Sequence, residues 1–109
     1  RIDKERLRQS MRILLDRPEL ADLVIANLAR WEDWSIQDKL MDLYGAKEYN
    51  IPSIKRAIVR YMLVSSKDAQ VAENIEPPAH VIKGRKNMAA LRKQDAKTVR
   101  EAERFFFLR

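Results

Sequence analysis

Residues 18–31 read PELADLVIANLARW, and residues 52–65 read PSIKRAIVRYMLVS. The two segments begin with proline, lie 34 residues apart and carry apolar side chains at the same i, i+3, i+4 and i+8 positions. Self-similarity at a fixed period is typical of stacked helix pairs, because one pair cannot bury its apolar stripe alone. The near-repeat therefore predicts a short α-α superhelix.

Composition supports an all-α protein with a single domain over residues 1–109. The chain has only two glycines and four prolines, and 35% of its residues are charged. A β-sandwich of this length would need a turn signal about every 8–12 residues. The chain has no cysteine, which excludes disulfides and thiolate metal sites. No apolar run is long enough for a membrane span, and the start at Arg1 suggests a fragment of a longer protein.

Helical periodicity and end signals predict about six helices. Ser35, with Asp38 three residues later, is expected to cap the third helix, and Gly45 to end it in the left-handed conformation. Asp95 is the expected cap of the last helix. The helices are expected at 3–16, 19–31, 36 to the stop at Gly45, 52–65, 79–93 and 96 onward, with a short turn around 68–75.

The expected buried faces place the second and fourth helices at the centre. The second helix is apolar almost all round, with Leu23 and Ala26 included, so little of it should meet solvent. In the first helix, Arg8 and Arg12 are expected to point to water. In the fifth helix, the face bearing Gly84 is expected to pack inward.

A family resemblance appears in the fourth predicted helix. It is similar to the second-helix signature of HEAT repeats, in which a proline precedes aliphatic, basic and small residues and a final apolar residue. The resemblance implies an armadillo-type helical-repeat fold. In residues 18–28 the basic position holds Ala21, so the pattern matches less fully there. The matching positions are Pro52, Ile54, Lys55, Ala57, Ile58 and Met62.

The chain as a whole also resembles helical segments of large uncharacterised bacterial proteins that are exported or attached to the envelope. The segments that carry this likeness are Ala26–Asp33, Ile51–Met62 and Asp95–Phe107. The resemblance implies an exported or envelope-associated parent protein and no particular chemistry.

Residues suited to catalysis or metal binding are few. His80 is the only histidine and has no cysteine to pair with, which excludes a histidine-based triad within this segment. With only Gly45 and Gly84 there is no phosphate-binding glycine loop. Asp38 and Asp42 lie one helical turn apart, but two carboxylates without a third ligand favour a solvated face over a cation site. We therefore expect no enzyme activity, no cofactor and no metal.

Two aromatic segments have alternative interpretations. The tryptophans of residues 31–34 could form a ligand platform or fill the gap between neighbouring helices, and the second role is the commoner one. The run 105–108 cannot face one way on a helix, so Phe106 is expected inside while its neighbours either pack internally or form an interaction patch. The candidate patch consists of Phe105, Phe107 and Leu108.

Charge is distributed unevenly along the chain. Residues 1–82 carry 13 basic and 13 acidic side chains, so the whole excess of +6 comes from residues 83–109. Four of these bases are spaced by seven and form two adjacent rows on the fifth helix. The rows could bind an anion or could simply keep the helix soluble. The candidate anion-binding residues are Arg85, Lys86, Arg92 and Lys93.

These observations favour a non-enzymatic helical scaffold that binds protein. The alternative is a module that binds an anionic polymer, either nucleic acid or polysaccharide, through the basic C-terminal third. Nucleic acid is the less favoured partner, because no aromatic residues alternate with the basic rows. The partner itself is not specified by the sequence.

Overall fold

The computed structural model describes residues 3–67 and 77–107, with backbone only for residues 105–107. Helices and short 3-10 turns make up the described elements, and no strand occurs among these residues. The α-helices are α1 (Lys4–Leu14), α2 (Ala21–Arg30), α3 (Gln37–Leu43), α4 (Pro52–Lys67), α5 (Ala79–Gln94) and α6 (Ala96–Phe107). The 3-10 turns are η1 (Pro18–Leu20), η2 (Trp34–Ile36) and η3 (Lys47–Tyr49).

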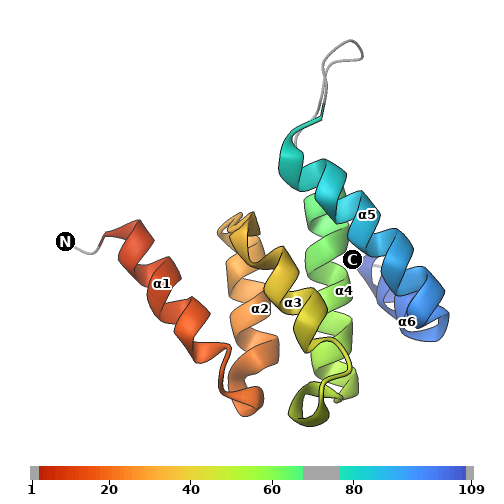
Figure 1. The fold of residues 1–109 in the computed structure, drawn as a ribbon, viewed down its shortest axis with the longest axis horizontal. Helices are drawn as coiled ribbons and strands as arrows, with labels where there is room; N and C mark the ends of the chain where they lie inside the picture. The colour runs from red at the N-terminus through yellow and green to blue at the C-terminus, as the bar shows by residue number, and fades with distance from the viewer. Residues whose placement is uncertain (1–2, 68–76, 108–109) are drawn as a thin grey trace.

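Helix α4 lies at the centre of the arrangement (Figure 1). It packs against α2 on one side and against α5 and α6 on the other, and α3 also contacts it. Helix α1 lies on the far side of α2, and successive helices run in alternating directions. The structure confirms the expected all-α fold of about six helices. The helix-pair repeat stays a prediction.

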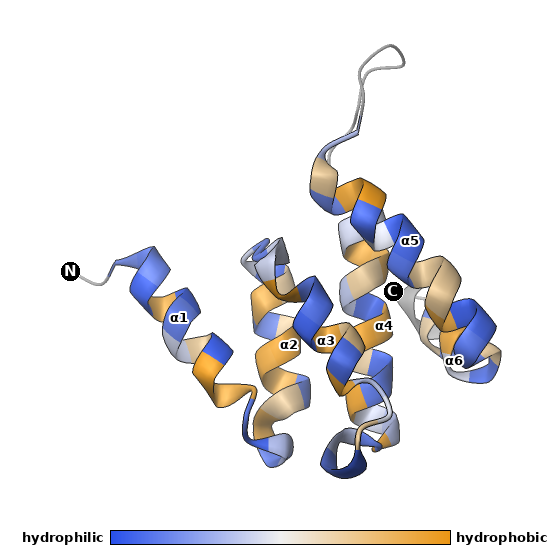
Figure 2. Cartoon of the chain, viewed as in Figure 1, coloured by the Kyte–Doolittle hydropathy of each residue, from blue (hydrophilic) through white to orange (hydrophobic). Residues whose placement is uncertain are grey.

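The core is continuous and is built mainly around α4. Ile54, Ile58 and Met62 recur at four-residue intervals and are at most 2% exposed. Buried residues on other faces of the same helix, including Val59 and Leu63, explain how it can contact several helices at once. Helix α1, in contrast, contains no fully buried residue, and its hydrophobic positions gather in its C-terminal half (Figure 2).

A buried polar network joins α3, α4 and α5. The side-chain amide of Gln37 donates to Ser65 Oγ at 2.9 Å and to the carbonyl of His80 at 3.1 Å. Asn87 in turn donates to Gln37 Oε1 at 2.9 Å. Among the described residues, no buried side-chain polar atom lacks a hydrogen-bond partner. The network therefore fixes how these three helices align without the cost of an unpaired polar group.

Gly84 is buried on α5, as the predicted inward face required. A Cβ atom at this position would lie 2.9 Å from both Ser65 Oγ and the backbone nitrogen of Ser66. Any larger side chain would push α5 away from α4, so glycine is what permits this close approach.

The helix ends confirm two predicted signals and correct a third. Gly45 has φ of 77° just after α3, and Asp95 Oδ1 accepts a hydrogen bond from the Thr98 nitrogen at 3.3 Å. The predicted cap of α3 at Ser35 is wrong, because Ser35 lies inside η2, which Asp33 caps, and the residue that precedes α3, Ile36, makes no side-chain cap hydrogen bond. Asp33 Oδ1 accepts from both the nitrogen and the hydroxyl of Ser35.

The structure also corrects two predictions about which side chains are exposed to solvent. Leu23 is 63% exposed and Ala26 is exposed, so α2 is not covered all round as predicted. The reason is that α1 and α4 cover only part of its surface. Arg8 and Arg12 are partly buried and do not simply point to water. Arg8 donates a hydrogen bond to the Trp31 carbonyl at 3.0 Å, and Arg12 donates one to the Asp33 carboxylate at 2.8 Å.

Candidate functional site

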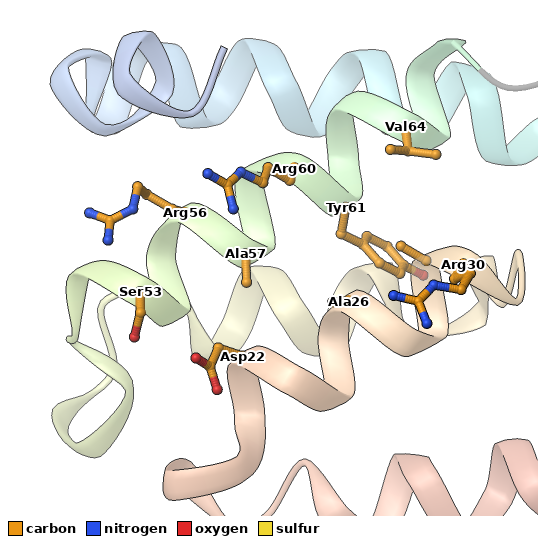
Figure 3. Close-up of a pocket in the computed structure, with 10 residues that line it drawn as sticks. Asp22, Ala26, Arg30, Ser53, Arg56, Ala57, Arg60, Tyr61 and Val64 are labelled. Atoms are coloured by element: carbon orange, nitrogen blue, oxygen red, sulfur yellow. The ribbon is translucent and has the colours of Figure 1, made fainter. Parts of the chain in front are cut away.

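A groove of about 620 Å³ runs between α2 and α4 (Figure 3). Its walls combine small side chains with three arginines. Ala26, Ser53, Arg30 and Arg60 are exposed, so the groove is open to solvent along its length. The lining residues are Asp22, Ala26, Ala29 and Arg30 from α2 and Ser53, Arg56, Ala57, Arg60, Tyr61 and Val64 from α4.

Helical spacing brings these residues to one place. On α4 the lining positions follow an i, i+3, i+4, i+7, i+8 and i+11 pattern from Ser53 to Val64, which is one face of a helix. On α2 they follow i, i+4, i+7 and i+8 from Asp22 to Arg30. Alanine at positions 26, 29 and 57 leaves the space between the helices unfilled. The groove is thus the product of two matched faces with small residues at their centre.

The charged side chains of the groove are unevenly paired. Arg56 is 4.0 Å from Glu101 of α6, which makes a long and partly exposed ion pair. Neither Arg30 nor Arg60 forms an ion pair or side-chain hydrogen bond with another described residue. Asp22 accepts a hydrogen bond from the neighbouring Leu23 nitrogen at 2.9 Å. The arginine side of the groove therefore carries positive charge that the described residues do not neutralise.

Tyr61 forms a rigid part of the groove floor. Its side chain is 1% exposed, and its hydroxyl donates to the Asp33 carbonyl at 2.5 Å. Burial raises the pKa of Tyr61 above the ordinary tyrosine value, and the charge of Asp33 raises it further. The ring also meets Trp34 edge-on, with centroids 5.2 Å apart. Tyr61 therefore keeps its proton and is a neutral, packed side chain.

Asp33 anchors the structure beneath the groove. Its carboxylate pairs with Arg12 Nε at 2.8 Å and is only 4% exposed. Burial alone would raise the pKa of Asp33, but hydrogen bonds from Arg12 and Ser35 outweigh that effect and lower it. This ion pair attaches α1 to the start of η2, so its role is structural.

The basic residues predicted to bind anions lie elsewhere. Arg85, Lys86, Arg92 and Lys93 are all exposed on α5. Arg92 pairs with Glu103 at 3.2 Å, so part of this charge is compensated by α6. None of the four lines the groove.

The predicted C-terminal interaction patch lies outside the described side chains. Phe105 and Phe107 belong to the α6 backbone, and Leu108 lies beyond the described residues. Their part in an interface stays a prediction.

Three other residues singled out in the sequence, Trp34, His80 and Asp38, have structural partners. Trp34 packs against the core and stacks on the ring of His80, with centroids 5.6 Å apart. Asp38 lies on an exposed face, where its carboxylate is 2.7 Å from Lys83. Within residues 3–67 and 77–107, no three histidine or acidic side chains are grouped closely enough to hold a metal ion.

Among the helices described here, none combines the length and apolar character that crossing a bilayer requires.

Comparisons with protein families, with curated proteins and with solved structures found no match for this chain.

The groove was not predicted from the sequence. The apolar pattern of the second helix predicts that Ala26 is buried, and no sequence signal marks Arg56 or Arg60 as binding residues. The available signal was the spacing of Arg56, Arg60 and the alanines along their helices. That spacing shows which residues share a face, but it does not show that the two faces meet with space between them.

Proposed function

We propose that this chain is a non-enzymatic helical domain that binds a partner protein through the groove between α2 and α4. The observation that carries the proposal is the groove itself, which is open, has a volume of about 620 Å³ and has small residues along its floor. On α4 the lining runs from Ser53 to Val64, a span of 11 residue steps, or about 16 Å at 1.5 Å per residue. A partner helix of about three turns has the same length.

The open form of the groove supports a protein segment over a small molecule. Small-molecule sites usually enclose most of the ligand surface. Here Ala26, Ser53 and Arg60 are exposed along the walls, so a small ligand would keep much of its surface in water. An amphipathic helix laid into a groove needs only its apolar face covered.

The test is selection of binders from a display library of helical peptides, followed by a groove-blocking variant. Ala26→Phe places a large side chain in the groove from an exposed position, so it should not disturb the core. Ala89→Phe, at an exposed position of α5 outside the groove, is the matched control. We expect Ala26→Phe to weaken binding of selected peptides at least about tenfold and Ala89→Phe to leave it unchanged. Peptides that bind both variants equally, or a library without binders, would overturn the proposal.

A further inference from the structure

We propose that the partner segment is an acidic amphipathic helix, with carboxylates flanking the apolar stripe that enters the groove. This inference rests on the proposed protein-binding function and adds the chemistry of the partner. Its basis is the set of three arginines at the groove, Arg30 on α2 and Arg56 and Arg60 on α4.

The two arginines of α4 lie close together, and only one of them has an acidic partner among the described residues. Arg56 and Arg60 are separated by one helical turn, an arrangement in which like charges repel. Only Arg56 has an acidic neighbour among the described residues, and Glu101 is 4.0 Å away. A partner with two acidic side chains one turn apart could meet both guanidinium groups and relieve this repulsion.

Arg30 extends the basic character to the opposite wall. It lies on α2 and, within the described part of the chain, has no ion-pair or side-chain hydrogen-bond partner. Figure 3 shows the Arg30 side chain near Tyr61, while Arg56 and Arg60 project from the other helix. A partner helix would therefore meet positive charge on both flanks and the alanine floor at its centre. That distribution complements an apolar stripe bordered by glutamate or aspartate on each side.

Asp22 makes the groove asymmetric. Figure 3 places it beside Ser53 and Ala57, toward the end opposite Arg30. A carboxylate on the partner flank that faces α2 would be repelled there, so the acidic residues of that flank should lie near Arg30. The same feature disfavours nucleic acid, whose phosphates are spaced evenly along the strand. Among the described residues of the lining, Tyr61 is the only aromatic one, and it is too buried to serve as a stacking platform for bases.

The test uses three side-chain cross-linked helical peptides of about 16 residues, long enough for the roughly 16 Å of groove. They share one apolar stripe and carry glutamate, glutamine or lysine on its flanks. We expect the glutamate peptide to bind about tenfold or more tightly than the glutamine peptide, and the lysine peptide to bind most weakly. Raising the salt concentration should narrow these differences.

Two double variants separate the groove from the overall charge of the protein. Arg30→Glu with Arg60→Glu reverses two exposed groove residues, and Arg85→Glu with Arg100→Glu reverses two exposed residues outside it. Both change the net charge equally. The groove variant should lose about tenfold or more of its affinity for the glutamate peptide, and the other should lose little. Arg30→Lys with Arg60→Lys, which keeps the charge, should retain most of the affinity, and an equal loss in this variant would overturn the inference.

The outcomes distinguish this inference from the proposed function. If the glutamine peptide binds as tightly as the glutamate peptide, the acidic partner is wrong and the groove remains a protein-binding site. If no peptide binds, both proposals fail. If a single-stranded oligonucleotide binds more tightly than any peptide and the groove variant abolishes that binding, the partner is a nucleic acid and the inference is overturned.

Discussion

Asp95 joins three parts of the chain through one carboxylate. Its Oδ2 accepts a hydrogen bond from the Tyr44 hydroxyl at 2.9 Å and is paired with Lys55 at 3.0 Å. Its Oδ1 caps α6 through the Thr98 nitrogen. Burial alone would raise the pKa of Asp95, but the hydrogen bonds from Thr98, Lys55 and Tyr44 lower it well below its usual range. The folded protein therefore favours the charged carboxylate.

Acidification should consequently destabilise the domain through Asp95. Because the pKa is lowered in the folded state, the stabilisation is complete above the unfolded value of about 3.9 and is lost as pH falls through the folded value. Asp95→Asn should cost about 1–3 kcal/mol at neutral pH and flatten the loss of stability in acid. Urea unfolding at neutral and acidic pH measures both effects. Asp42→Asn, at an exposed position, is the control. If the stability of the wild type and of Asp95→Asn changed identically with pH, Asp95 would not be the group responsible.

At the scale of the element, α4 has a core face and a groove face. Ile58 is fully buried, whereas the adjacent Ala57 is only partly buried and lines the groove. The sequence predicts that aspartate in place of Ala57 would unfold the domain, because that face was expected to be enclosed. In the structure, a carboxylate at position 57 would reach the groove beside Arg56 and Arg60.

The two substitutions should therefore differ. Ile58→Asp places an unpaired charge in the core and should cost several kcal/mol, enough to unfold a domain whose total stability is about 5–15 kcal/mol. Ala57→Asp should cost only about 1 kcal/mol and leave the domain folded. Thermal unfolding followed by circular dichroism measures the difference, with exposed Ala89→Asp as the control. Equal unfolding by the two substitutions would mean that the groove is closed in solution.

At the scale of the whole molecule, two basic surfaces lie on different elements. One is the groove with its three arginines, and the other is the exposed face of α5. The α5 surface is partly compensated, since Arg92 pairs with Glu103 and Lys83 pairs with Asp38. Pairing of this kind lowers the charge available to an anionic polymer.

We accordingly expect duplex DNA to bind more weakly than about 1 µM at physiological salt. Titrations monitored by fluorescence anisotropy at several salt concentrations measure both the affinity and its dependence on salt. Each phosphate contact contributes about 0.9 to the slope of log affinity against log salt. Submicromolar binding with a steep slope, lost on charge reversal of Arg85, Lys86, Arg92 and Lys93, would favour the anionic-polymer function over the protein scaffold.

The sequence by itself determined the helical class, the approximate position of each helix and several of its ends. Periodic apolar residues, Gly45 and Asp95 act over one or two turns, so their effect can be read from neighbouring residues alone. The wrong assignment of a cap to Ser35 also has a local cause. Asp33 lies two residues earlier and caps η2, the turn that contains Ser35.

Only the tertiary structure decided which faces are covered. Leu23 and Ala26 are as apolar as their buried neighbours, but exposure depends on where α1 and α4 lie relative to α2. Likewise, Arg8 and Arg12 find partners more than 20 residues away. The groove arises because two alanine-bearing faces meet without filling the space between them. That outcome depends on helix placement and side-chain volume together, which the spacing of residues along one helix does not specify.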